Sequence, residues 1–141
     1  MKPSSLIHLM QCALAGFRAG ARLRDKWLAF LLACLGQAGR HRQGFRGWLL
    51  RQLKRSSVDG TITVTLRRPP MRHAAHLRLR EGNESDYLVV AELLHQSRSA
   101  PSAVPGEIID CGANIGTFSV WAAAVFPGVP LHCYEPEPDN V

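Results

Sequence analysis

Two acidic residues and a pair of glycines in the last third of the sequence have the types and spacing of a nucleotide-binding site. Asp110 ends a short apolar run, Gly112 and Gly116 follow it four residues apart, and Glu135 ends the next apolar run. Glycines at such a position let the backbone turn tightly and approach a ligand closely. A carboxylate after the second run matches the two hydroxyls of a ribose, because its oxygens only accept hydrogen bonds when ionised.

The spacing of the glycines narrows the class of nucleotide. The stretch 112–116, Gly-Ala-Asn-Ile-Gly, lacks the middle glycine of the G-x-G-x-x-G pattern that admits a pyrophosphate, which disfavours NAD. No lysine follows Gly116, so the stretch is no phosphate-binding P-loop. The acid at Asp110 suits a ligand that carries positive charge. S-adenosylmethionine, with its sulfonium and ammonium groups, fits this description and is the cofactor we expect.

A strand, a turn, a helix and a second strand are needed to bring these residues together. Ile108 and Ile109 are β-branched and suit a parallel strand buried on both faces, and residues 130–134 form the next strand. Asn114 is the expected N-cap of the helix between them, which should end near Pro127. This order predicts an α/β protein with the start of a doubly wound, Rossmann-like sheet.

The stretch 108–141, with its Asp-x-Gly-Ala-Asn-x-Gly turn and its Glu-Pro pair, resembles the cofactor-binding start of the FkbM family of methyltransferases, and the likeness extends back to residue 77. The resemblance implies a class I methyltransferase fold and O-methylation of a hydroxyl on a sugar or natural product. Substrate and catalytic groups of that family come from later strands, so no catalytic residue is assigned. By position, the resemblance implies a cofactor site made of Asp110, Gly112, Ala113, Asn114, Gly116 and Glu135.

The sequence has the length of a single domain and divides into three expected regions. Its 141 residues suit one domain, and its 46% hydrophobic content allows a core. We expect a basic helical region at 1–56, a β-pair and capping helix at 57–104, and the first β-α-β unit of the cofactor-binding domain at 105–141. A doubly wound sheet needs further parallel strands, so we expect a truncated methyltransferase without activity by itself.

Charge is distributed unevenly. Residues 1–56 hold 11 Lys and Arg against one Asp (+10), residues 57–80 hold five against one (+4), and residues 81–141 hold one against nine (−8), which gives the formal net charge of +6. The basic region can neutralise the acidic remainder or bind an anionic membrane surface. No nucleic-acid-binding motif is present, so no nucleic acid is expected as a partner. The alternative function is a non-catalytic membrane-peripheral or interaction module with a vestigial nucleotide motif.

Three helices are expected in the basic region, at residues 4–18, 27–35 and 45–54, because apolar residues recur there at helical spacing or form a continuous run. The run at 27–35 has nine residues and is too short to span a bilayer as a helix. These helices either pack on the rest of the chain or lie on a membrane with their aromatic and basic side chains.

Two short strands and a helix follow. Residues 61–66 and 76–80 alternate apolar and polar side chains and predict an antiparallel pair. Ser85 or Asp86 is the expected N-cap of the next helix. In the resembled family this helix lies over the cofactor, which makes both residues candidates to line the pocket.

The four cysteines predict the redox setting. They form no C-x-x-C pair and no ligand-spaced pair with a histidine, so no metal site is expected. Cys111 and Cys133 fall on the two predicted parallel strands, where a reduced cysteine packs as a small apolar side chain. We therefore expect both to be buried and the protein to be cytoplasmic, or peripheral to a membrane on that side.

Overall fold

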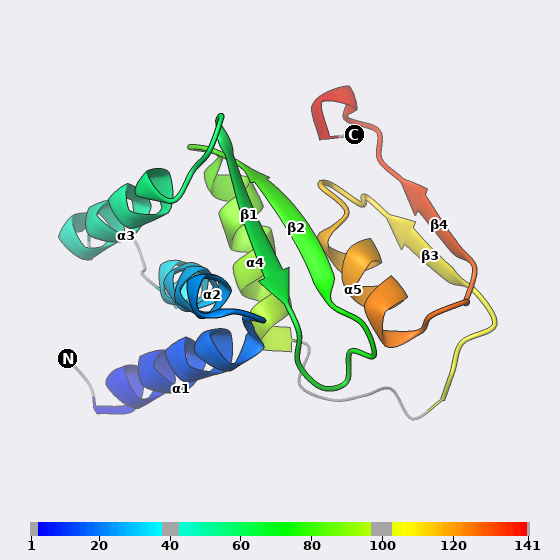
Figure 1. Ribbon diagram of the computed structural model, residues 1–141, viewed down its shortest axis with the longest axis horizontal. Helices are drawn as coiled ribbons and strands as arrows, with labels where there is room; N and C mark the ends of the chain where they lie inside the picture. The colour runs from blue at the N-terminus through cyan, green and yellow to red at the C-terminus, as the bar shows by residue number, and fades with distance from the viewer. Residues whose placement is uncertain (1–2, 38–42, 97–102, 141) are drawn as a thin grey trace.

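The computed structural model describes residues 3–37, 43–96 and 103–140, and these residues form a mixed α/β structure. The elements are, in chain order, α1 (Pro3–Ala19), α2 (Leu23–Gln37), α3 (Gln43–Arg55), β1 (Thr61–Leu66), β2 (Ala75–Arg80), α4 (Glu84–Gln96), β3 (Ile108–Cys111), α5 (Thr117–Val125), β4 (Leu131–Tyr134) and the 3-10 helix η2 (Pro138–Asn140). In Figure 1 the strands β1 and β2 separate the helices α1 to α3 from the unit formed by β3, α5 and β4. The coarse α/β prediction is confirmed.

The helices α1 and α2 pack against each other at very short range. A Cβ added at Gly16 would lie 2.4 Å from the carbonyl oxygen of Ala29 and 2.8 Å from the Cβ of Ala33. A side chain at position 16 is therefore excluded by the backbone of α2 rather than by a movable side chain. Along α2, the side chains of Leu28, Leu31, Leu32 and Leu35 are almost fully buried and belong to the core.

The predicted antiparallel pair is confirmed, with Thr61 opposite Arg80 and Leu66 opposite Ala75. The apolar and polar side chains alternate between the two faces as the sequence predicts: every second side chain of each strand is buried against the helices. The chain between α1 and α2 continues this pairing: the N–H of Ala21 donates to the carbonyl of Thr65 over 2.9 Å. The basic helices and the β-pair therefore share one core.

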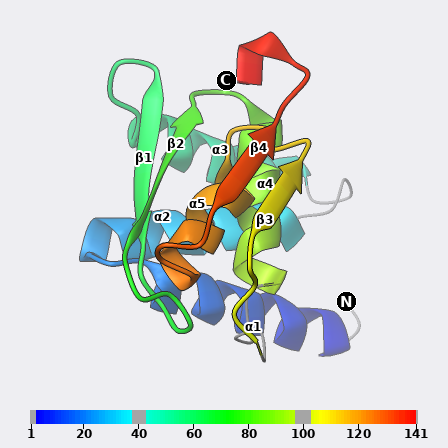
Figure 2. The same ribbon diagram turned by 90° about the vertical axis from the view of Figure 1, so that its right-hand side faces the viewer.

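The carboxyl-terminal unit is a parallel β-α-β crossover. β3 and β4 pair in parallel from Ile108 opposite Leu131 to Cys111 opposite Tyr134. Helix α5 covers one face of this pair and also contacts β2, which places it between the two sheets (Figure 2). Among the described residues the two sheets are separate and have two strands each. The helix ends at Val125, close to the predicted end.

The expected burial of β3 on both faces is wrong. Ile109 is 57% exposed, whereas Asp110 is buried on the side of α5. Cys111 and Cys133 are exposed as well, which corrects the expectation that both are buried. The reason is that α5 covers a single face and that β3 and β4 have no further neighbouring strand among the described residues.

Two predicted N-caps are also wrong. Asn114 adopts a left-handed conformation with φ of 53° inside the turn, and the N-cap of α5 is Gly116. Neither Ser85 nor Asp86 caps α4. The side-chain oxygen of Asn83 accepts instead from the N–H groups of Ser85 and Asp86, at 3.1 and 3.4 Å, because α4 begins earlier than the sequence indicates.

Candidate functional site

The turn between β3 and α5 has an unusual backbone. Gly112 and Gly116 have φ values of 78° and 70°, and Asn114 between them also has a positive φ. Most residues with a Cβ are strained at positive φ, although asparagine tolerates it better than most. The backbone conformation therefore favours glycine at positions 112 and 116. A Cβ added at either glycine would meet no atom within 4 Å. The backbone of the turn is therefore open to a ligand at both glycines.

The turn is held against the end of β4. The N–H groups of Gly112 and Ala113 donate to the carbonyl oxygen of Tyr134, at 2.7 and 3.1 Å. The N–H of Asn114 donates to Oε2 of Glu135 over 2.6 Å. The structure thus brings together the glycine turn and the second acid, although 21 residues separate Asn114 from Glu135.

Glu135 is a preorganised carboxylate. Its Oε1 accepts from the N–H of Glu137 at 2.9 Å and from the side-chain amide of Asn140 at 3.4 Å. The N–H of Glu137 and then that of Asn114 lower the pKa of Glu135, since both donate to its ionised form. Each carboxylate oxygen has about two acceptor sites, so Oε2 can accept a further hydrogen bond from a ligand hydroxyl.

Asp110 lies beneath the turn rather than at its open side. It is 9% exposed, and its Oδ2 accepts a hydrogen bond of 2.5 Å from the hydroxyl of Ser119. Ser119 also lies 3.0 Å from the sulfur of Cys133 on β4. These contacts join β3, α5 and β4 directly behind the turn. The sequence analysis missed Ser119. A small hydroxyl residue on the first turn of the helix that follows Asp110 could have indicated this hydrogen bond.

A second network links the site to the antiparallel pair. Asp86 is fully buried, and its carboxylate accepts from the backbone N–H of Arg80 at 2.8 Å, from Nε at 3.0 Å and from Nη2 at 2.6 Å. Arg80 in turn donates from Nη1 to the carbonyl of Asp139 and from Nη2 to Oδ1 of Asn140. Because Asn140 also donates to Glu135, the ion pair of Arg80 with the buried Asp86 helps to hold the second acid in place.

These contacts place the candidate site residues in two groups. Asn114 is bonded to Glu135, and Ala113 beside it is bonded to the carbonyl of Tyr134, with Gly112 and Gly116 at the open side of the turn. Asp110 and Asp86 are buried supports, so the idea that Asp86 lines a pocket gives way to a structural role. Carboxylates from Asp110 to Asp139 make this end of the chain negative, which favours a cationic ligand.

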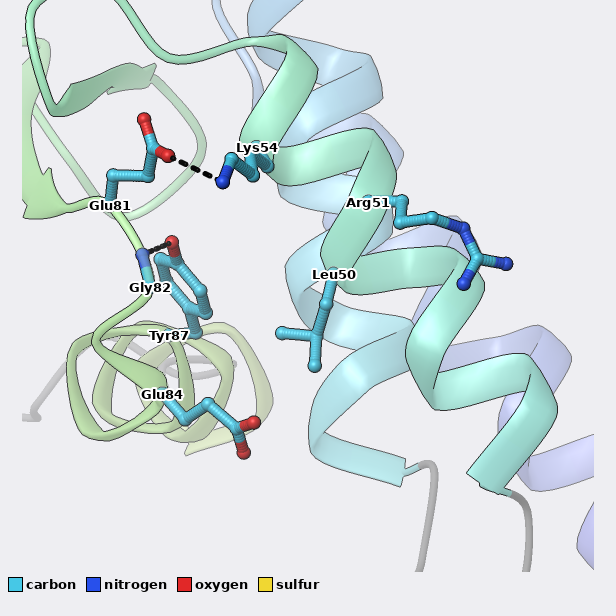
Figure 3. Close-up of a pocket in the computed structure, with 7 residues that line it drawn as sticks. All are labelled: Leu50, Arg51, Lys54, Glu81, Gly82, Glu84 and Tyr87. Atoms are coloured by element: carbon cyan, nitrogen blue, oxygen red, sulfur yellow. Dashed lines mark hydrogen bonds and ion pairs between the residues drawn. The ribbon is translucent and has the colours of Figure 1, made fainter.

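Two other cavities, both lined by described residues, present no converging reactive groups. The pocket in Figure 3 has a volume of about 220 Å³, and its acids Glu81 and Glu84 are paired with Lys54 and Arg46. A larger, apolar groove beside β3 is lined by Ala103, Pro105, Ile108, Phe118, Trp121, Ala122 and Phe126. No group of three or more His, Cys, Asp or Glu side chains that could hold a metal ion is found among the residues with described positions.

The helices offer no membrane span: none in the described ranges is long and apolar enough to cross a bilayer. Comparison with known proteins adds no relative, since no family model, no curated protein and no solved structure matches the chain.

Proposed function

We propose that the chain carries the cofactor-binding part of an S-adenosylmethionine-dependent methyltransferase of the FkbM type, which methylates a hydroxyl of a sugar or natural product. The observation that supports this most is the hydrogen bond of 2.6 Å from the N–H of Asn114 to Glu135. It sets the glycine turn of β3 beside the acid of β4. Ligands of α/β proteins bind outside the carboxyl ends of parallel strands, where both features lie.

The residues present fit an adenosine cofactor with positive charge. Glu135 is ionised, and its Oε2 has one acceptor site free for a hydroxyl of a ribose. The open backbone at Gly112 and Gly116 admits the methionine part of the ligand, as the resemblance implies. The sulfonium supplies the methyl group, and the residues of this chain bind and orient it, which is the main requirement of a direct transfer to an oxygen. No base is assigned.

A specific observation favours the alternative of a non-catalytic module. Both acids already have partners within the chain: Asp110 is bonded to Ser119, and Glu135 accepts from three donors. Acids that are hydrogen-bonded within the chain can stabilise the fold without binding a cofactor. Cofactor binding separates the two hypotheses.

The test is a titration of the isotopically labelled protein with S-adenosylmethionine, followed by NMR, because amide shifts detect weak binding. We expect shifts at Gly112, Asn114 and Gly116, and no displacement of the cofactor by NAD. Glu135→Ala should weaken the affinity about ten- to a hundredfold, the usual effect of losing charge-assisted hydrogen bonds.

The matched control is Glu107→Ala. This variant removes the same charge just before the other end of β3, where the side chain is 64% exposed. It should leave the affinity unchanged. If the amides of the turn do not shift, or if Glu135→Ala and Glu107→Ala bind equally well, the proposed cofactor site is wrong and the structural interpretation of the motif stands.

A further inference from the structure

One face of the α1–α2 pair is apolar although it is exposed. On α1, Met10, Leu14 and Phe17 are spaced so that they form one stripe, and on α2, Leu23, Trp27 and Phe30 form another. Met10 is 57% exposed and Leu23 is 77% exposed. We name these six side chains, together with Lys26, the hairpin face.

The two stripes meet across the helix pair. Helix α1 approaches α2 closely at Gly16 and Ala29. The stripe of α1 and the stripe of α2 lie on the same side of this contact and are therefore next to each other. Lys26 bridges them, with its Nζ 5.7 Å from the centroid of the Phe17 ring. Trp27 and Phe30 stack with their ring centroids 5.4 Å apart. The hairpin face is therefore one continuous surface.

The border of this surface is cationic. Arg18 on α1, Arg22 between the two helices and Arg24 on α2 are exposed, and Nη2 of Arg24 also donates to the carbonyl of Ser56. Asp25 is the single acid in the described part of these two helices, and it is buried. Its carboxylate accepts from the backbone N–H groups of Arg22 and Thr65, at 3.3 and 3.1 Å. No carboxylate of these helices therefore offsets the arginines at the surface.

We infer that the hairpin face docks onto an anionic lipid membrane, with both helices lying in the plane of the interface. Apolar and aromatic side chains enter the boundary between headgroups and acyl chains, and the basic border contacts anionic headgroups. Rings such as those of Phe17 and Trp27 suit this depth, and Lys26 keeps its ammonium group in water while its stem covers apolar surface. Helix α3 also carries a stacked pair of exposed aromatic rings, Phe45 and Trp48, which suit the same membrane interface.

The charge pattern selects this partner over a second copy of the chain. A twofold contact through the hairpin face would bring two basic borders together, with no exposed acid of these helices to pair with them. An anionic bilayer complements both the apolar centre and the basic border. The inference is independent of the proposed methyltransferase function, because no residue of the hairpin face belongs to the cofactor site.

Flotation of the 141-residue chain with two kinds of vesicle tests the inference: phosphatidylcholine alone, and phosphatidylcholine mixed with phosphatidylserine. We expect binding to the mixed vesicles only, weakened by salt. Arg18→Gln/Arg22→Gln should lower the partition coefficient about twenty-fivefold, since each basic residue near an anionic surface contributes about fivefold. Arg78→Gln on β2, also exposed, is the control for a loss of charge and should have a much smaller effect.

Two further variants test the apolar part. Leu14→Ala/Leu23→Ala keeps the helices and should reduce binding about tenfold. Leu88→Ala, which removes a similarly exposed leucine from α4, should leave it unchanged. Vesicles that contain brominated lipid should quench the tryptophan fluorescence of the unaltered chain, and Trp27→Phe should reduce the quenching.

Several outcomes would overturn the inference. Equal binding to neutral and mixed vesicles would remove the role of charge, and binding insensitive to Leu14→Ala/Leu23→Ala would remove the hairpin face from the contact. A concentration-dependent dimer in sedimentation that disappears in the same leucine variant would assign the face to a second copy. Absence of binding to either vesicle, with circular dichroism showing a folded chain, would reject it outright.

Discussion

The buried carboxylate of Asp86 should be a principal source of stability. The perturbation is Asp86→Asn, which keeps the size of the side chain and removes its charge. In the best orientation, the amide oxygen replaces Oδ2 and still accepts from the backbone N–H and the Nε of Arg80. The amide nitrogen then faces Nη2 of Arg80, where the carboxylate accepted over 2.6 Å, so two donors meet.

The size of the effect follows from these contacts. One charge-assisted hydrogen bond, worth about 1.5–3 kcal/mol, is lost. The bond from the backbone N–H becomes neutral, and the bond from Nε keeps only the charge of its guanidinium donor, so both weaken. The side chain of Arg80 is 40% exposed, so water replaces part of what it loses. We therefore expect Asp86→Asn to lower the free energy of unfolding by about 2–3 kcal/mol, less than for a pair buried on both sides.

Urea unfolding followed by circular dichroism measures this change, with an unchanged m value showing that the folded state is otherwise preserved. Asp59→Asn, which removes the same charge from an exposed turn with positive φ, should shift stability by less than about 0.5 kcal/mol. Arg80→Met should cost more than Asp86→Asn, because it leaves a buried carboxylate without its partner. The double variant should then be more stable than the sum of the two losses predicts. An Asp86→Asn variant as stable as Asp59→Asn would refute this account of the ion pair.

Two other predictions concern the helix pair and the core. Gly16→Ala should destabilise the chain by about 1–3 kcal/mol, because its Cβ would lie 2.4 Å from the carbonyl oxygen of Ala29, whereas Gly47→Ala on α3, with its nearest contact at 3.6 Å, should stabilise it by about 0.5–1 kcal/mol. Equal effects of the two variants in urea unfolding would contradict the close approach of α1 and α2. Burial raises the pKa of Cys34 to about 11 and also raises the pKa of Tyr87, so the folded state holds both protons more tightly than the unfolded state. The part of this stability that comes from Cys34 is fully present below about pH 8.5, where the unfolded thiol is protonated, and should be lost as the pH rises through about 11. Unfolding free energies measured across this range should fall less steeply for Cys34→Ala/Tyr87→Phe, and an unchanged slope would show that neither group contributes.

The sequence by itself determined the features that depend on local pattern. The helical spacing of α1 and α3, the apolar run of α2 and the alternation of β1 and β2 each specify an element through which side chains it can bury. The turn at Gly112 and Gly116 was also predictable, since it requires positive φ values that glycine adopts without strain. The parallel pairing of β3 and β4 followed from the order strand, helix, strand.

The tertiary structure alone decided which distant residues meet and which faces are covered. The sequence placed Asn114 and Glu135 in one site, but the direct hydrogen bond between them, and the path from Asp86 through Arg80 and Asn140, depend on tertiary contacts that no local pattern encodes. The exposure of Ile109 was missed for a related reason. An apolar run shows that a strand can be buried on both faces, but burial requires a second layer. In the described chain, α5 supplies only one.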